Sequence, residues 1–452
     1  MSMDLTVFRD KLFRAAADAG FTDYEIYYIS NVTDTYRVQG GEVAEYKSAG
    51  ADGLSFRGVY AGKMGYASSE RIAEDVIPYL VENAKQNALI IESEDAETLY
   101  EGEAEYPTVA GCNPALGAVP SRELAETALR LEKEAFAADA RVTGVDYCVL
   151  SRGTGAMLLA NSKGLNACHS DSYVLSYIQP KIADGEDVKT GFTYIAGSDW
   201  SVVDAAALAK EAVDIAVAKL GAKPVASGSY DVLIGRDAMM DLTEAFAGVF
   251  SAESVQKGFS LLAGKMGTTV ASPVVSIRDD ALLPDALGSV PFDSEGVAGQ
   301  NKAVIKNGVL KTFLHNRKTA AKDGVASTGN GFKASFRASV GIQPTNFYIV
   351  PTKATKEDML VKLGNGLYIT ELEGLHAGTN EVSGDFSLSC RGFVVENGAI
   401  GAPVEQITVA GSFFKLLTDI EAVGGDFRWG VPSGCNMGSP SVLVRGLSIS
   451  GK

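Results

Sequence analysis

The chain has 452 residues and a formal net charge of −16; 46% of its residues are hydrophobic and 21% are charged. These values are ordinary for a globular protein of two or three domains, and the excess of carboxylates argues against direct binding to a phosphate backbone. The N-terminus lacks a signal-peptide pattern, and no apolar run approaches the ~18 residues of a membrane span. We therefore expect a cytoplasmic protein with no nucleic-acid or membrane partner.

Cysteine usage gives a second limit on function. The five cysteines are scattered and include no CxxC pair: Cys112, Cys148, Cys168, Cys390 and Cys435. An odd, dispersed set argues against a disulfide framework and against a zinc cluster of thiolates.

Amphipathic helices and glycine-turned hairpins alternate in the first half of the chain. Apolar residues at helical spacing predict helices, and Gly40-Gly41 and Gly62-Lys63 predict tight turns between strands. The predicted elements are a helix over 4–19, a strand over 25–30, hairpins over 35–46 and 54–68, a helix from Ser69 with a serine cap, a helix over 121–139, strands over 147–151, 156–160, 166–178 and 191–196, and a helix over 202–220.

Strands followed by a small-residue turn and a long helix occur twice, over Thr35–Ala88 and Val149–Leu220. The turn around Gly65 in the first segment parallels the turn around Gly191 in the second. This predicts an internal duplication, although no repeat is convincing residue by residue.

Ala222-Lys223-Pro224 is the predicted joint between an N-terminal domain, 1–222, and a C-terminal domain, 223–452. The N-terminal domain combines hairpins with long helices. After the joint a strand over 228–235 and a helix over 236–250 lead into short strands separated by glycines. Such a pattern predicts an α+β protein whose C-terminal domain is a mostly antiparallel β barrel or sandwich.

The stretch from Glu371 to Ile400 is the most informative part of the second half. It carries His376 in a glycine-hinged loop, then alternates apolar and polar residues after Asp385, and reaches a predicted hairpin turn at Asn397-Gly398. A polar loop leading into a rigid hairpin suits a binding site. The alternative interpretation is a plain surface loop and hairpin.

Five segments resemble the TldD/PmbA family, and within it the PmbA (TldE) branch. They are GLHAGTNEVSGDFSLSCRGFVVENG (374–398), APVEQITVAGSFFKLLTDIEAVGGD (402–426), FDSEGVAGQNKAVIKNGVLKTFLHNRKTAAKDG (292–324), STGNG (327–331) and GSPSVLVRGLSISG (438–451). The resemblance implies a cytoplasmic zinc metallopeptidase of two related subunits, linked to peptide-antibiotic maturation and antitoxin turnover. The family also carries the name modulator of DNA gyrase.

The resembled catalytic subunit holds zinc with an H-E-x-x-x-H motif and a cysteine nearer the C-terminus. In this chain Thr243 and Gly248 stand at the two histidine positions, while Glu244 is kept. No thiol occurs around Ala422–Asp426, and Cys435 does not match the ligand position. Two histidines at that spacing lie roughly 140° apart on a regular helix, so the motif implies a bulge or a helix end. The alternative interpretation of Glu244 is a solvated helix carboxylate.

The three histidines, His169, His315 and His376, are too far apart in sequence to form a local zinc pair. A Ser–His–acid hydrolase would need His376 or His315 to meet a serine and a carboxylate, such as Ser383 and Asp385, and no G-x-S-x-G motif is present. An independent metallopeptidase or hydrolase with a site assembled from distant residues, and a non-enzymatic homodimeric binding protein, remain alternatives.

The leading hypothesis is a PmbA/TldE-like subunit without its own catalytic residues, metal ligands or cofactor. Zinc is then expected only in a TldD-like partner, and the pair acts on peptides. His376, Glu381, Asp385 and Glu244 are the predicted substrate-binding or interface residues, and the 371–400 hairpin with its preceding loop is the predicted sheet edge for a substrate strand. The sequence leaves open whether the chain is an enzyme in its own right.

Overall fold

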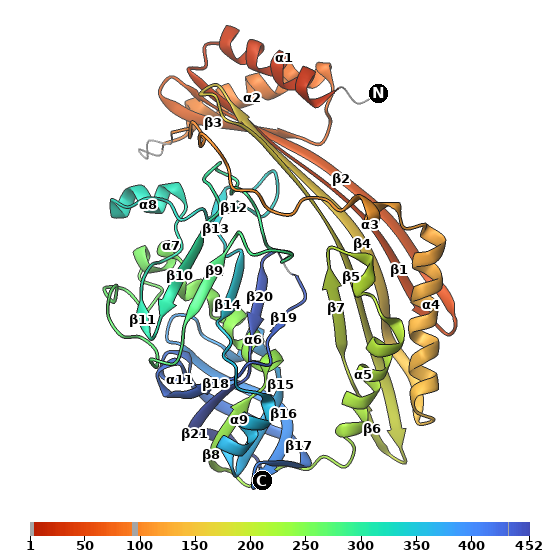
Figure 1. Ribbon diagram of the computed structural model, residues 1–452. Helices are drawn as coiled ribbons and strands as arrows, with labels where there is room; N and C mark the ends of the chain where they lie inside the picture. The colour runs from red at the N-terminus through yellow and green to blue at the C-terminus, as the bar shows by residue number, and fades with distance from the viewer. Residues whose placement is uncertain (1–3, 93–97, 433) are drawn as a thin grey trace.

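The structure is a computed structural model that describes residues 4–92, 98–432 and 434–452. The first half of the chain forms one long, arched sheet with helices near its two ends (Figure 1). The second half, with a barrel and a smaller sheet, lies inside the curve of this arch.

The arched sheet is antiparallel and has the strand order β3-β2-β1-β4-β5-β6, with β7 pairing to β5. Its strands are β1 (Asp23–Gln39), β2 (Glu42–Tyr60), β3 (Lys63–Ser69), β4 (Val142–Asn161), β5 (Asn166–Asp184), β6 (Asp187–Thr190) and β7 (Thr193–Gly197). The turn predicted at Gly40-Gly41 is confirmed, because both glycines have a positive φ, 67° and 80°. Segments predicted as separate strands merge into β1 and β4, which continue through their polar residues because no core covers the middle of the sheet.

The helices of this half are α1 (Leu5–Asp18), the short 3-10 helix η1 (Glu74–Val76), α2 (Ile77–Ile90), α3 (Pro114–Ala118), α4 (Ser121–Ala138), the 3-10 helix η2 (Trp200–Val202) and α5 (Ala205–Ala218). The predicted first helix is confirmed, and the Asp4 side chain caps it by accepting from the backbone N–H groups of Thr6 and Val7. The helix predicted from Ser69 begins later. Ser69 is instead the last residue of β3, paired with Leu54, so no serine caps α2.

The predicted duplication corresponds to a repeated topology. A helix, two long strands, a short strand and a second helix occur as α1-β1-β2-β3-α2 and again as α4-β4-β5-β7-α5 with β6 inserted. The two glycines that sequence reasoning paired also play the same part. A Cβ atom at Gly65 would lie 1.8 Å from the Ala84 carbonyl oxygen of α2, and one at Gly191 would lie 2.0 Å from the Ala212 carbonyl oxygen of α5. In each unit the helix can approach the sheet closely because the residue at the contact is a glycine, which has no side chain.

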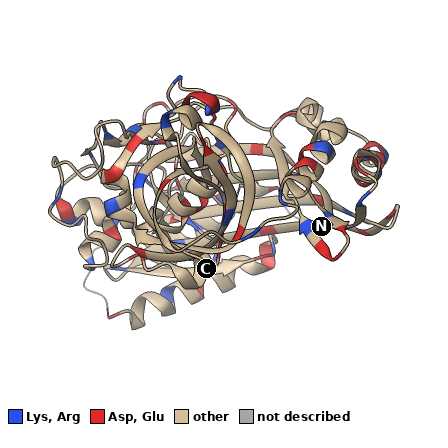
Figure 2. Cartoon of the chain, turned by 90° about the horizontal axis from the view of Figure 1, so that it is seen from below, with Lys and Arg blue, Asp and Glu red and all other residues tan. Residues whose placement is uncertain are grey.

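The C-terminal half contains a closed barrel, which Figure 2 shows end-on as a ring. The strand order is β17-β16-β15-β8-β21, with β18 beyond β21, and pairing of β17 with β21 closes the ring. These strands are β8 (Gly228–Ile234), β15 (Gly366–Glu373), β16 (Asp385–Glu396), β17 (Ala399–Ser412), β18 (Ile420–Val423) and β21 (Val442–Ser450). The predicted α+β class with a largely antiparallel C-terminal barrel is confirmed.

A second sheet, β11-β10-β9-β14-β20-β19, and a two-stranded ribbon, β12-β13, complete this half. Their bounds are β9 (Ile277–Asp280), β10 (Asn301–Lys306), β11 (Val309–Leu310), β12 (Gly331–Lys333), β13 (Val340–Ile342), β14 (Asn346–Ile349), β19 (Arg428–Trp429) and β20 (Asn436–Ser439). The helices are α6 (Arg236–Ala245), the 3-10 helix η3 (Ala247–Phe250), α7 (Ala252–Gln256), α8 (Arg317–Asp323), α9 (Lys356–Leu363), α10 (Leu375–Gly378) and α11 (Phe413–Asp419). Across the described ranges, no helix is long and apolar enough to cross a membrane.

The N-terminal half contacts the C-terminal half near both ends of the arched sheet. Near one end, the Tyr106 hydroxyl donates to the Gly296 carbonyl oxygen at 2.7 Å and Lys333 Nζ donates to Ser55 Oγ at 2.9 Å. Near the other end, the Tyr194 hydroxyl donates to the Trp429 carbonyl oxygen at 2.7 Å. Because the two contacts are far apart along the sheet, they fix its position on the C-terminal half.

Gly191→Ala tests the close approach of α5 to the sheet. We expect the variant to lose about 2–3 kcal/mol of unfolding free energy, because the added methyl group overlaps backbone atoms that cannot move separately. Gly117→Ala is the matched control: it lies in α3 with open space around the Cβ position, and its stability should change by less than about 1 kcal/mol. Urea unfolding of the three proteins measures the difference, and equal stability of the two variants would contradict the packing described here.

Candidate functional site

Helix α6 carries the positions at which the sequence lacks the expected histidines. Thr243 is 1% exposed, and its hydroxyl donates to the Met239 carbonyl oxygen one turn earlier at 2.7 Å. The helix ends at Ala245, and the 3-10 turn Ala247–Phe250 follows, so the helix end implied by the motif spacing is present. Thr243 is therefore packed inward, with its hydroxyl used within the helix.

The second position, Gly248, lies in the 3-10 turn and faces the side chain of Glu381. A Cβ atom at Gly248 would lie 2.5 Å from Glu381 Oε2. Glu381 comes from the loop between β15 and β16, so the structure brings this predicted residue to the end of α6. A side chain at position 248 would have to displace the glutamate carboxylate.

Glu244 is exposed on α6, and Cys435 lies close enough to feel its charge. Burial, followed by the nearby carboxylates of Glu244 and Asp279, raises the pKa of the Cys435 thiol to about 11. The sequence could not predict that Cys435 lies near α6, because the two are far apart in the chain and only the fold brings them together. The high pKa keeps the thiol protonated near neutral pH.

One face of α6 is acidic. Asp237, Asp241 and Glu244 follow each other at spacings of four and three residues, which places them on the same side of the helix. Burial is the main cause that raises the pKa of Asp241 to about 7, and the carboxylates of Asp237, Glu244 and Glu371 raise it further. Asp237 is opposed by Arg428, whose Nη1 lies 3.9 Å from its Oδ1.

The loop that carries His376 is fixed by hydrogen bonds of its own backbone. Asn380 Oδ1 accepts from the N–H groups of Val382 and Ser383, and the Asn380 N–H donates to the Asp385 carbonyl oxygen at 2.9 Å. The side chains of His376 and Asp385 are exposed and form no hydrogen bond or ion pair with other described residues. Short helix α10, which holds His376, contacts α6.

The hairpin after this loop has the predicted turn but not the predicted edge. Asn397 and Gly398 both have positive φ, 53° and 77°, as a tight two-residue turn requires. However, β16 pairs with β15 on one side and β17 on the other, inside the closed barrel. The prediction of a free edge for a substrate strand is wrong for β16, which is paired on both sides, whereas the second side of β17 pairs with β21 only at Thr408–Ala410.

The residues at the motif positions do not fit zinc. The Thr243 hydroxyl is buried and donates to a carbonyl oxygen, and Gly248 has no side chain. Neither position offers the imidazole or thiolate that zinc binds. Over residues 4–92, 98–432 and 434–452, no three His, Cys, Asp or Glu side chains are grouped as metal ligands.

Comparison with known proteins places this geometry in a family. Models of the PmbA/TldA metallopeptidase match domain 1 over residues 24–88, the central domain over 114–220 and the C-terminal domain over 227–451. These domains define a metallopeptidase-type fold. The chain belongs to the PmbA/TldD family.

Three relatives illustrate the match. The crystal structure of a Thermotoga maritima protein, named as a modulator of a DNA gyrase, is 33% identical with a TM-score of 0.91, over 99% of this chain and 100% of that one. The metalloprotease PmbA homolog of Haemophilus influenzae is 28% identical, over 94% of this chain and 90% of the relative. The metalloprotease TldD homolog of Buchnera aphidicola is 26% identical, over 95% and 93%. Overall identity thus hardly separates the relatives named PmbA from those named TldD.

Asp241→Asn tests the ionisation of the acidic face. Since the pKa of Asp241 is raised to about 7 from 3.8, the folded state keeps a proton that the unfolded state loses, and the unfolding free energy falls as pH rises between these values. The variant lacks this titration, so its stability relative to the unmodified chain should rise by about 1–2 kcal/mol from roughly pH 5 to pH 8. Denaturant unfolding at several pH values measures it; a constant difference would contradict the assignment.

Proposed function

We propose that this chain is the PmbA/TldE-type subunit of a two-subunit peptidase, without a zinc site of its own, and that a TldD-type partner supplies the metal. The observation that carries this proposal is the pair of side chains on α6. Thr243 donates its hydroxyl to a carbonyl within the helix, and Gly248 presents only a hydrogen atom to Glu381. Both positions would need an imidazole for the zinc chemistry of the family.

The same geometry supports a role in peptide or partner binding. Glu381 and Glu244 belong to different elements and both lie at the end of α6, while His376 sits on α10 against the same helix. Asp385 begins β16 at the end of the loop. We assign these four residues to the surface that faces the peptide or the partner subunit. Because β16 is paired on both sides, this surface would bind through side chains rather than by adding a strand to the hairpin.

An independent hydrolase has less support. The Cys435 thiol, with its pKa near 11, is not prepared as a nucleophile. His315 is 5% exposed, and Ser327 and Thr328 reach its backbone carbonyl oxygen rather than its ring. The geometry therefore offers no serine–histidine pair around His315 in the described chain.

Metal content and activity of the purified chain test the proposal. We expect less than about 0.1 equivalent of zinc and no peptide hydrolysis from the chain alone, and chelator-sensitive hydrolysis after a TldD-type subunit is added. Stoichiometric zinc with chelator-sensitive hydrolysis by the isolated chain would overturn it. Light scattering without a partner separates the homodimeric binding protein from a subunit that needs a different chain.

Glu244→Ala tests whether the retained glutamate is catalytic. We expect activity of the reconstituted pair to fall by less than about threefold, because Glu244 has no metal-bound water to deprotonate in this subunit. The matched control is the same substitution at the glutamate of the partner's zinc motif, which should abolish hydrolysis. A loss of several orders of magnitude from Glu244→Ala would show that this subunit takes part in the chemistry.

A further inference from the structure

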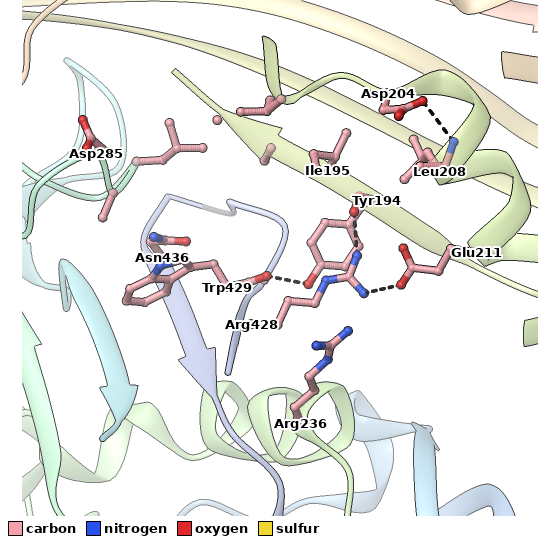
Figure 3. A pocket seen from close by; sticks show the side chains of 17 residues that line it. Tyr194, Ile195, Asp204, Leu208, Glu211, Arg236, Asp285, Arg428, Trp429 and Asn436 are labelled. Carbon is pink, nitrogen blue, oxygen red and sulfur yellow. Dashed lines mark hydrogen bonds and ion pairs between the residues drawn. The ribbon is translucent and has the colours of Figure 1, made fainter. Parts of the chain in front are cut away.

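A cavity of about 400 Å³ lies between the two halves of the molecule, away from the exposed end of α6 that carries Glu244. Strand β7 and helix α5 form one wall, and the start of α6 with β19 and β20 forms the other (Figure 3). Its volume is within the range of small-ligand sites. The proposed subunit role does not use it.

Arg236 gives this cavity an available positive charge. It is the first residue of α6, so the unpaired N–H groups of the helix start lie beside it. Its nearest carboxylate oxygen is Asp237 Oδ2, 3.7 Å from Nε, and its guanidinium forms no hydrogen bond with the described residues. Figure 3 shows the side chain extending from α6 toward Arg428 and the cavity. A guanidinium in this position can bind a carboxylate through two parallel hydrogen bonds.

Arg428, by contrast, is already used by the protein. Its guanidinium donates to Thr193 Oγ1 at 2.9 Å, to the Tyr194 carbonyl oxygen at 2.6 Å and to Glu211 Oε1 at 3.3 Å, and it lies over the Tyr194 ring. Arg428 therefore holds the two walls together and also neutralises Glu211. Of the remaining carboxylates that line the cavity, Asp204 caps α5, and Asp285 is exposed on the far side from Arg236.

The wall opposite Arg236 is mostly apolar. Ile195, Val202 and Leu208 line it, and Leu287 and the Trp429 indole add apolar surface elsewhere in the cavity. This surface suits an aliphatic side chain next to the group that Arg236 binds.

Asn436 is a rigid part of the cavity lining. It is 2% exposed, and its Nδ2 donates to Asn346 Oδ1 at 3.0 Å, which fixes the orientation of the amide. Its Oδ1 has no hydrogen-bond donor among the described residues. The amide is therefore a fixed part of the buried wall, because its Oδ1 atom has almost no surface accessible from the cavity.

We propose that this cavity binds a carboxylate that lies next to an apolar side chain. Arg236 binds the carboxylate, and the wall of Ile195 and Leu208 holds the side chain. Two ligands share this chemistry: the C-terminal residue of a short peptide and a free apolar amino acid. The inference goes beyond the subunit role, since it concerns the isolated chain and needs neither zinc nor a partner.

Trp429 gives a direct readout, because it lines the cavity and the sequence has only two tryptophans. In a Trp200→Phe background, fluorescence is titrated with N-acetyl-alanyl-leucine, with its C-terminal amide, and with free leucine. We expect saturable binding at roughly millimolar concentration or below for at least one carboxylate, and about tenfold weaker binding of the peptide amide than of the peptide acid. The tighter of the two carboxylates identifies the source of the ligand.

Three variants test the assigned contacts. Arg236→Gln should weaken binding about tenfold or more, and Arg236→Lys by less, because it keeps the charge and loses only the paired geometry. Ala207→Phe fills the cavity from its exposed wall and should abolish binding while leaving Arg236 in place. Arg122→Gln, on the exposed face of α4, is the control for loss of one positive charge and should bind as the unmodified chain does.

The proposal is overturned if no probe gives a saturable change, if acid and amide bind equally, or if Arg236→Gln or Ala207→Phe binds unchanged. Thermal unfolding of each variant confirms that the chain remains folded. This experiment measures neither zinc content nor hydrolysis, so a negative result would not contradict the proposed subunit role. Conversely, finding zinc and hydrolytic activity in the isolated chain would not contradict the carboxylate site.

Discussion

Phe246 stacks on Phe413 with ring centroids 4.6 Å apart and an angle of 10° between the ring planes. Both rings are fully buried, so each removes its whole side chain from water, a contribution of about 1.5–3 kcal/mol. Phe246 follows the last residue of α6, and Phe413 is the first residue of α11 after β17. The contact ties the helix that carries the motif positions to the strand that closes the barrel. Because Phe246 must face this core, the chain leaves the helix there, and Gly248 turns toward Glu381.

This arrangement shows which interactions hold the motif positions in place. The helix, its end and the loop that covers it depend on aromatic packing and on backbone hydrogen bonds, none of which involves a cation. Thr243 needs only to be small and able to donate to the preceding turn, and Gly248 needs only to leave room for a glutamate. The local structure at these two positions therefore depends on packing and hydrogen bonding of the chain itself.

Much of the fold could be predicted from local sequence, and the exceptions share a cause. Glycine turns, the first helix and the turn at Asn397-Gly398 depend on nearby residues, and they occur where expected. The start of α2 was misplaced because pairing with Leu54 holds Ser69 in β3, which only the sheet register reveals. Barrel closure between β17 and β21 and the approach of Glu381 to Gly248 join segments far apart in the chain. No local pattern encodes these contacts, so the strands and turn of the 371–400 hairpin could be predicted, but the pairing of β16 on both sides could not.

The two repeated units share one sheet rather than packing as separate bodies. Strand β1 of the first unit pairs with β4 of the second from Glu25 to Arg37. Cutting the chain in the connector between the units and separating the pieces would leave a long row of backbone donors and acceptors without partners on each fragment. Unpaired backbone groups of this kind form hydrogen bonds with strands of other chains. The stretches matched as domain 1 and the central domain are therefore units of topology, and a dissection between them would expose an unpaired sheet edge on each fragment.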